Sequence, residues 1–368
     1  MISRQTPIPG TGSRPGRHRL LRWSVPVSVA AVIALIASGV LHSERPSAAL
    51  PQTTPAALLA SVGTPTVTGF SGTVVSHISL GLPDLPSIGD LPGGSPLASL
   101  LSGSRTLQVW YGGVDKQRVA LLGTTDETDL FRSGRSLWRW DSADHEADHL
   151  RVPTGSGTQT PGLAALTPAA MASMALTSLK SLRPTTRITV RSDRDVADRA
   201  AYELILQPKT VQTRIASVHI AIDGRTKVPL GVQVYARGSS TPAIDVSYSS
   251  IRFAAPSDTT FDFSPPMGAK VRHLSMHALR RSGALTPERL TLAGPNWAGV
   301  LGYDTKRPVH LAGLGLGRAL TRVSGAWGSG RLLQTSLVSV LLLHDGRVFA
   351  GAVDPSELYA AAARTQRK

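Results

Sequence analysis

Residues 105–152 read RTLQVWYGGVDKQRVALLGTTDETDLFRSGRSLWRWDSADHEADHLRV, and this stretch decides the fold. Short runs of β-prone residues recur in it at regular intervals, with turn-forming residues such as Gly112-Gly113 between them. This spacing predicts antiparallel hairpins, because each hairpin needs only local closure. The expected strands are Leu107–Tyr111, Gln117–Leu122, Thr128–Phe131, Leu137–Trp140 and His149–Val152. We therefore expect a single, strongly curved antiparallel sheet.

The same strand pattern surrounds this stretch on both sides. One strand is expected at Phe70–Ser79, and Asp223-Gly224 predicts a hairpin turn between two later strands. The later strands are expected at Arg187–Val190, Ala201–Leu206, Ser217–Ile222, Leu230–Tyr235, Ala243–Tyr248 and Ile251–Phe253. Helical spacing of apolar residues predicts helices at Thr53–Val62 and Thr167–Leu182. A bent sheet leaves an apolar face that must be covered, so we expect these two helices to cover it.

Composition excludes several classes of protein. The chain has 368 residues, 41% of them hydrophobic, a formal net charge of +15 and no cysteine. Without cysteine there are no disulfides and no thiolate metal sites. The arginines form no stripe that alternates with stacking aromatics, so we expect no nucleic-acid binding. The bias towards Arg, Ala, Gly and Pro is typical of a high-G+C bacterium, and the charge would suit an anionic membrane surface.

The N-terminus predicts export. Arg14, Arg17, Arg19 and Arg22 precede an uncharged run over residues 24–41, which leaves the basic end inside the cell. Residues 1–49 therefore read as a basic segment followed by a signal peptide or membrane anchor. Cleavage after Ala49 and retention as an anchor both stay open. In either case we expect an extracytoplasmic location, either secreted or anchored to the outer face of the cytoplasmic membrane.

One motif resembles a catalytic site. His145-Glu146-Ala147-Asp148-His149 matches the H-E-x-x-H pattern of zinc metalloproteases, which requires a helix to bring both imidazoles to one side of the metal. Here the motif follows a predicted strand and turn, so a hairpin tip is expected and the protease is a distant third hypothesis. The run Gly313–Gly317 lacks the spacing of a dinucleotide loop. We expect no catalytic residues, no cofactor, no metal and no enzymatic activity.

Three later motifs carry a resemblance to a known group of proteins. They are Val196–Leu204, the segment Ile220–Pro229 with Asp223, and Phe261–Ala269; Leu137–Asp141 adds a fourth. In sum they resemble the LolA-like lipoprotein carriers and the RseB-like sigma-E regulatory proteins, as an exported member of actinobacterial type. The resemblance covers residues 50–271. It implies an α+β fold in which a curved antiparallel β half-barrel, covered by helices, holds acyl chains or a lipidated protein.

Strand parity and the resemblance together predict the lining of such a cavity. Leu107, Val109 and Tyr111 share one side of their strand, and we assign this side inward. Trp138 and Trp140 share a face large enough to form one wall, and Arg118 is the nearest match to an arginine that helps close the lid in the resembling group. The apolar side of the second predicted helix adds Met171, Met174 and Leu179.

The C-terminal part reads as a separate unit. We expect a linker at residues 272–284 and a small α+β domain at residues 285–368. Its expected elements are a strand at Asn296–Tyr303, a helix at His310–Arg322, a hairpin of Ser336–Leu343 and Arg347–Val353, and a final helix at Pro355–Ala363. Arg322, Arg331 and Arg347 are expected to be ordinary surface charges.

Two functional hypotheses follow. The first is an exported carrier or chaperone that binds a lipid or lipidated protein at the membrane surface. The alternative is an RseB-like sensor that controls a membrane-bound anti-sigma factor through its C-terminal domain.

Overall fold

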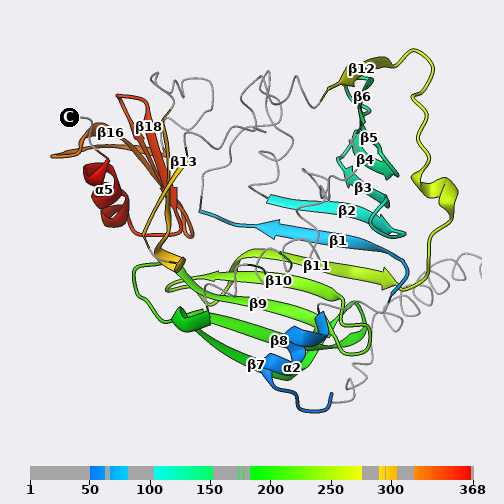
Figure 1. Ribbon diagram of the computed structural model, residues 1–368, viewed down its shortest axis with the longest axis horizontal. Coiled ribbons are helices and arrows are strands. Elements are labelled where there is room, and N and C mark those ends of the chain that lie inside the picture. The colour runs from blue at the N-terminus through cyan, green and yellow to red at the C-terminus, as the bar shows by residue number, and fades with distance from the viewer. Residues whose placement is uncertain are drawn as a thin grey trace, which may run out of the picture. The chain divides into compact units, whose positions relative to one another are not determined.

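The described part of the chain folds into a twelve-stranded sheet and a six-stranded sheet (Figure 1). The structure is a computed structural model, and it describes residues 50–62, 67–81, 103–151, 173, 177, 183–275, 290–294, 296–304 and 319–365. The predicted export segment and most of the helix predicted at Thr167–Leu182 lie outside these residues, although Ser173 and Thr177 are helical.

The first half of the large sheet is the predicted series of hairpins. The strands β2 (Gly103–Tyr111), β3 (Lys116–Leu122), β4 (Glu127–Ser133), β5 (Ser136–Asp141) and β6 (Glu146–Arg151) pair antiparallel in chain order. Each connection is short, so each strand pairs with the strand that precedes it. This antiparallel meander is confirmed.

A second meander forms the other half. It consists of β7 (Thr186–Val196), β8 (Arg199–Pro208), β9 (Ile215–Asp223), β10 (Pro229–Ala236) and β11 (Pro242–Arg252). Strand β1 (Phe70–Ile78) joins the halves, because it pairs with β2 on one side and with β11 on the other. Gly72 makes this pairing feasible, since a Cβ atom there would lie 2.5 Å from the carbonyl oxygen of Ser250.

The far edge of the large sheet departs from the sequence prediction. Strand β12 (Lys270–Leu274) pairs parallel to β6, and it follows a 3₁₀ turn, η5 (Asp258–Phe261). Residues 272–274, expected in the linker, therefore belong to the large sheet. The ion pair between Arg272 and Asp148, with Nε–Oδ1 at 2.7 Å, holds this short strand in place. Local sequence patterns give no signal for a pairing across more than 100 residues.

The helix α2 (Pro55–Val62) confirms the first predicted helix. Its Leu58 is buried against Tyr202, Leu204 and Ile220 of the large sheet, and Figure 1 shows the helix beside β7 and β8. A single turn, η4 (Arg183–Thr185), leads into β7. The full helical cover and the half-barrel curvature remain predictions. Among the described helices, none has the length and hydropathy needed to cross a membrane.

The six-stranded sheet has the order β13-β14-β18-β17-β16-β15. Its strands are β13 (Leu290–Ala293), β14 (Val300–Asp304), β15 (Leu320–Gly325), β16 (Gly328–Gln334), β17 (Ser339–Leu343) and β18 (Arg347–Gly351). A 3₁₀ turn, η7 (Asn296–Ala298), precedes β14. The final helix α5 (Pro355–Arg364) packs Leu358 and Ala361 against Leu341 and Phe349. The predicted β17–β18 hairpin and final helix are confirmed.

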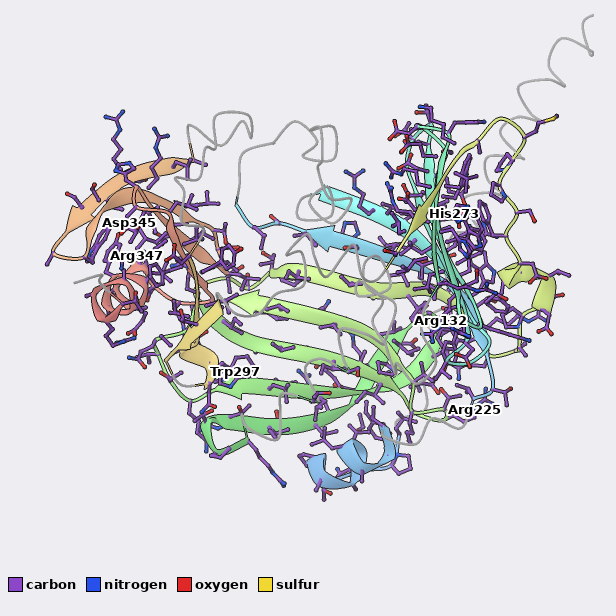
Figure 2. All side chains as sticks on the ribbon, turned by 45° about the horizontal axis from the view of Figure 1, so that its top comes forward. Arg132, Arg225, His273, Trp297, Asp345 and Arg347 are labelled. Atoms are coloured by element: carbon purple, nitrogen blue, oxygen red, sulfur yellow. The ribbon has the colours of Figure 1, made fainter. Side chains whose placement is uncertain are left out.

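Two expectations for this region are wrong. The helix predicted up to Arg322 is contradicted at its end, because residues from Leu320 onward form β15 and pair with β16; residues 310–318 lie outside the described part. Arg347 is only 6% exposed and therefore not a surface charge. It pairs with Asp345 (Nη2–Oδ2 2.8 Å), and its Nη1 donates to the Ala362 carbonyl at 2.9 Å (Figure 2).

Several contacts connect the two sheets. Thr213, which precedes β9, forms an isolated bridge with Val353. The next residue, Arg214, donates to Asp354 Oδ1 at 2.9 Å. The indole Nε1 of Trp297 donates to Thr186 Oγ1 at 2.7 Å. These contacts place the end of β18 and the start of β14 against the large sheet.

Candidate functional site

One face of the large sheet is apolar over most of its width. In the register of β1, β2 and β3, Val74 lies opposite Leu107, and Leu107 lies opposite Leu121. Leu107 and Val109 are 0% and 5% exposed. Tyr111, half-buried, stacks on Phe70 with ring centroids 5.2 Å apart. The expectation that Leu107, Val109 and Tyr111 share an apolar side is therefore met by the geometry.

This apolar face continues into the second meander. Val246 of β11 lies opposite Val232 of β10, and Val232 lies opposite Ile220 of β9. Ile220 in turn lies opposite Leu204 of β8. Side chains directly opposite in a sheet point to the same face, so the apolar surface runs without interruption from β3 to β8. We call it the apolar face.

A tyrosine hydroxyl is buried within the apolar face. Tyr248 is 2% exposed and packs edge-on against Phe70, with centroids 6.2 Å apart. Among the described residues its hydroxyl has no hydrogen-bond partner, and burial raises the pKa of Tyr248. An unsatisfied buried hydroxyl costs about 1–3 kcal/mol, so the fold tolerates an energetic penalty at this point.

The apolar face changes to a charged margin at one end. Along one row of opposed residues, Val119 is followed by Leu130, Arg139, Asp148 and Arg272. Arg139 pairs with Asp141 at 2.6 Å and with Asp148 at 3.3 Å. Burial alone would raise the pKa of Asp148, but hydrogen bonds from Arg272 and Arg139 lower it below its usual value. The margin is thus a network of ionised groups beside an apolar surface.

The register divides the predicted cavity residues between two faces. Arg118 lies opposite Trp110 and Phe131, and Phe131 lies opposite Trp138. Trp140 has the same parity as Trp138. These residues therefore lie behind the sheet from Leu107, Val109 and Tyr111, which corrects the expectation of one common lining. The prediction grouped Arg118 with the cavity through the resemblance, and Trp138 and Trp140 because their shared face is large enough to form a wall, whereas strand parity places all three on the other face.

Arg118 has a structural partner on its own face. Its guanidinium lies 4.7 Å from the ring centroids of Trp110 and Phe131. It binds Asp129 through two hydrogen bonds, of 2.9 and 3.1 Å, and Asp129 is 3% exposed. Breaking a buried pair of this kind leaves an uncompensated charge. This arrangement stabilises β3 and β4.

A carboxylate beside this pair titrates near neutral pH. Glu127 lies 3.4 Å from Arg118 Nη2. A hydrogen bond shared with Asp129, burial and the charge of Asp129 raise the pKa of Glu127 to about 7. Near neutral pH, Glu127 is therefore partly protonated.

The H-E-x-x-H motif lies on a turn and a strand, as its sequence context predicts. His145 ends the turn before β6, and His149 stacks on Trp138 with centroids 4.1 Å apart. His149 Nδ1 lies 3.3 Å from Nδ1 of His273, its opposite residue on β12. The described residues contain no group of three potential metal ligands. Without a helix, the motif lacks the geometry of a metalloprotease.

The sequence reasoning missed a polar cluster behind the second meander. His219 Nδ1 lies 3.3 Å from Glu203 Oε1, and Gln233 donates to Asp245 at 2.7 Å. A hydrogen bond to His219 is the main cause of the lowered pKa of Glu203. Alternation in Tyr202–Leu206 and Ser217–Ile222 already places these polar residues opposite the apolar face. Met171, Met174 and Leu179 lie outside the described residues.

Comparison with solved structures gives distant similarities. The chain is similar to MucB, with 14% identity over 83% of this chain and 95% of that chain and a TM-score of 0.41. It is similar to the MucA/MucB complex structure of Pseudomonas aeruginosa, with 15% identity, 83% and 94% coverage and a TM-score of 0.42. A LolA superfamily protein from Nitrosomonas europaea shows 12% identity, 58% and 99% coverage and a TM-score of 0.21.

The chain resembles LolA-like and RseB-like proteins. No protein-family model matches it, and no curated protein matches it either. Among the described residues, the apolar face and the charged margin are the features whose chemistry indicates a ligand.

Proposed function

We propose that this protein binds an acyl chain of a lipid or lipoprotein on the apolar face, outside the cytoplasm. The observation that carries the proposal is the continuous row that runs from buried aliphatic residues to the ion pairs of Arg139, Asp148 and Arg272. An amphiphile needs both surfaces, with the chain on the apolar part and the headgroup at the charged margin.

The energetics suit a carrier rather than a catalyst. Burial of each CH₂ group contributes about 0.8 kcal/mol, so a sixteen-carbon chain gains on the order of 10 kcal/mol relative to water. Relative to a bilayer the gain is close to zero, because lipid tails are equally apolar. A binding face of intermediate affinity can therefore accept a chain from one membrane and release it to another.

Binding requires the cover of the apolar face to move. Leu107, Val109 and Tyr248 are buried in this structure, so a guest must displace what covers them. Leu58 of α2 covers part of the face. In this proposal Met171, Met174 and Leu179 belong to the movable cover, and Leu107, Val109 and Tyr111 contact the chain. Trp138, Trp140 and Arg118 support the sheet from behind.

Two neighbouring leucines provide a matched test. Leu121 points to the apolar face and Leu122 to the other, and both are half-buried. Leu121→Gln should weaken binding of a fluorescent fatty acid about tenfold, or about 1.4 kcal/mol, because a half-buried leucine contributes less than a fully buried one. Leu122→Gln should change binding little. Mass spectrometry should also find less co-purified lipid in Leu121→Gln than in Leu122→Gln. Equal affinities in both variants, or no bound lipid in the parent protein, would overturn the proposal.

A second candidate function is a sensor that contacts a membrane-bound anti-sigma factor through the small sheet. Two exposed apolar residues of β14 favour it, because Leu301 and Tyr303 are 45% and 38% exposed. Leu301→Glu should abolish capture of such a partner from membranes. Val211→Glu, at a residue 78% exposed before β9, is the control and should leave capture unchanged. A protein that only carries lipid would capture no membrane regulator in either form.

A further inference from the structure

Two arginines face each other on the outer strands of the small sheet. In the register of β15 and β16, Arg322 lies directly opposite Arg331, and both are exposed. Like charges at directly opposed positions destabilise a sheet, because their Cβ atoms are only about 5 Å apart. Within the described residues, neither guanidinium has an ion pair. Other arginines of the two sheets, such as Arg118, Arg139 and Arg347, do have carboxylate partners.

The pair borders a hollow whose described lining contains no acidic residue. The hollow has a volume of about 400 Å³ and is lined by Arg322, Val323, Ser324, Ser329, Gly330, Arg331 and His344. Ser329 lies opposite Ser324 in the same strand pair, so both serines share the face of the arginines. Ser329 Oγ lies 3.0 Å from His344 Nδ1, which positions the imidazole. The nearest acid in sequence, Asp345, is bound to Arg347 instead.

These groups select for an oxyanion. Two guanidinium forks supply parallel N–H donors with a geometry that matches phosphate, and hydroxyl and imidazole groups can supply further donors. We propose that this hollow binds a phosphate group, free or as part of a lipid headgroup. A bound anion would remove the repulsion between Arg322 and Arg331. The site lies on the small sheet, so it is independent of the apolar face and of acyl-chain binding.

The residues that follow Arg331 across the small sheet indicate which source of phosphate fits better. Across the sheet, Arg331 is followed by Leu342, Val348 and Tyr303. Tyrosine beside aliphatic residues is typical of the interface between headgroups and acyl chains. A headgroup phosphate held by the arginines would place the adjoining glycerol against this row.

Isothermal titration of the full chain tests the site with two probes, inorganic phosphate and glycerol 3-phosphate. Arg322→Gln and Arg331→Gln should each weaken binding about tenfold or more, because each removes charge-assisted hydrogen bonds. Arg331→Lys keeps the charge but loses the fork, so it should also weaken binding. Arg225→Gln is the matched control. Arg225 is exposed in the turn between β9 and β10 (Figure 2), and its loss should change binding less than about twofold.

The outcomes separate the alternatives. Tighter binding of glycerol 3-phosphate than of inorganic phosphate assigns the site to a lipid headgroup, and equal binding assigns it to free phosphate. Absence of saturable binding, or an equal loss in Arg225→Gln, would overturn the site. Tighter binding of a glutamate-rich peptide with the same dependence on both arginines would overturn it in favour of an acidic protein partner. Fatty-acid binding by the variants should be unchanged, which distinguishes this site from the proposed function.

Discussion

Among single residues, Tyr248 connects stability with the proposed acyl-chain binding. Its hydroxyl is buried inside the apolar face and has no hydrogen-bond partner in the part of the chain that the structure describes. We expect Tyr248→Phe to stabilise the ligand-free protein by about 1 kcal/mol, because an unsatisfied hydroxyl is removed. The same variant should bind an acyl ester more weakly, since the hydroxyl can donate to an ester carbonyl. Urea unfolding and ester titration measure the two effects. Loss of stability in Tyr248→Phe would contradict this account.

Glu127 gives the protein a pH dependence near neutrality. Its pKa is raised from 4.5 to about 7, so the folded state holds the proton more tightly than the unfolded chain. This contribution to stability is fully present below about pH 4.5 and is lost as the pH rises through about 7. Glu127→Gln should remove this dependence, measured as the slope of unfolding free energy against pH. The exposed neighbour Asp126 provides the control Asp126→Asn, which should leave the slope unchanged.

At the level of elements, β12 is held by charges on one face and by histidines on the other. Burial, the charge of His273 and the charge of Arg151 lower the pKa of His149 below 6.5. Neutral His149 therefore contributes stability above about pH 6.5, and this contribution is lost as the pH falls through its lowered pKa. The protection factors of the amides of residues 270–274, which correct exchange for its intrinsic pH dependence, should decrease in acid.

The substitution His273→Gln separates this effect from the ion pairs. It removes the second imidazole and should flatten the acid dependence of amide exchange in β12. Arg272→Gln should instead accelerate exchange at every pH, because it breaks the two hydrogen bonds to Asp148, of 2.7 and 2.9 Å. If His273→Gln left the acid dependence intact, the histidine pair would have no part in it.

The elements also show what the sequence can predict. The hairpins from β2 to β6 follow from local alternation and turns, because each pairing partner is the next strand. The positions of β1 and β12 do not follow from local patterns, because their partners are far away in the sequence. Val74 pairs with Tyr248, and His149 pairs with His273. The prediction of the site had the same limit, because it needs the pairing of strands as well as their alternation. Parity assigned Leu107 and Val109 correctly to one side, but only the register shows that Arg118 and Trp138 lie on the other.

For the molecule as a whole, the contacts between the sheets should make unfolding cooperative. Arg214 donates to both Asp354 and the Ser336 carbonyl, and Trp297 donates to Thr186. We expect a single calorimetric transition for the parent protein. The double variant Arg214→Ala/Trp297→Ala should show a separate, earlier transition for the small sheet. Arg187→Ala, at an exposed position of β7, is the control. Two transitions in the parent protein would contradict strong coupling.

The position of β1 has a consequence for the proposed export. A chain that crosses a membrane from its N-terminus delivers Phe70–Ile78 long before Pro242–Arg252, the strand that completes its pairing. Until then, one edge of β1 presents unsatisfied amides and carbonyls to any other extended chain, which is the usual starting point of aggregation. In the proposed export, translocation would therefore expose a half-finished sheet for the time needed to thread more than 160 residues. Slowing translocation should increase misassembly, and a periplasmic-type holding chaperone should suppress it.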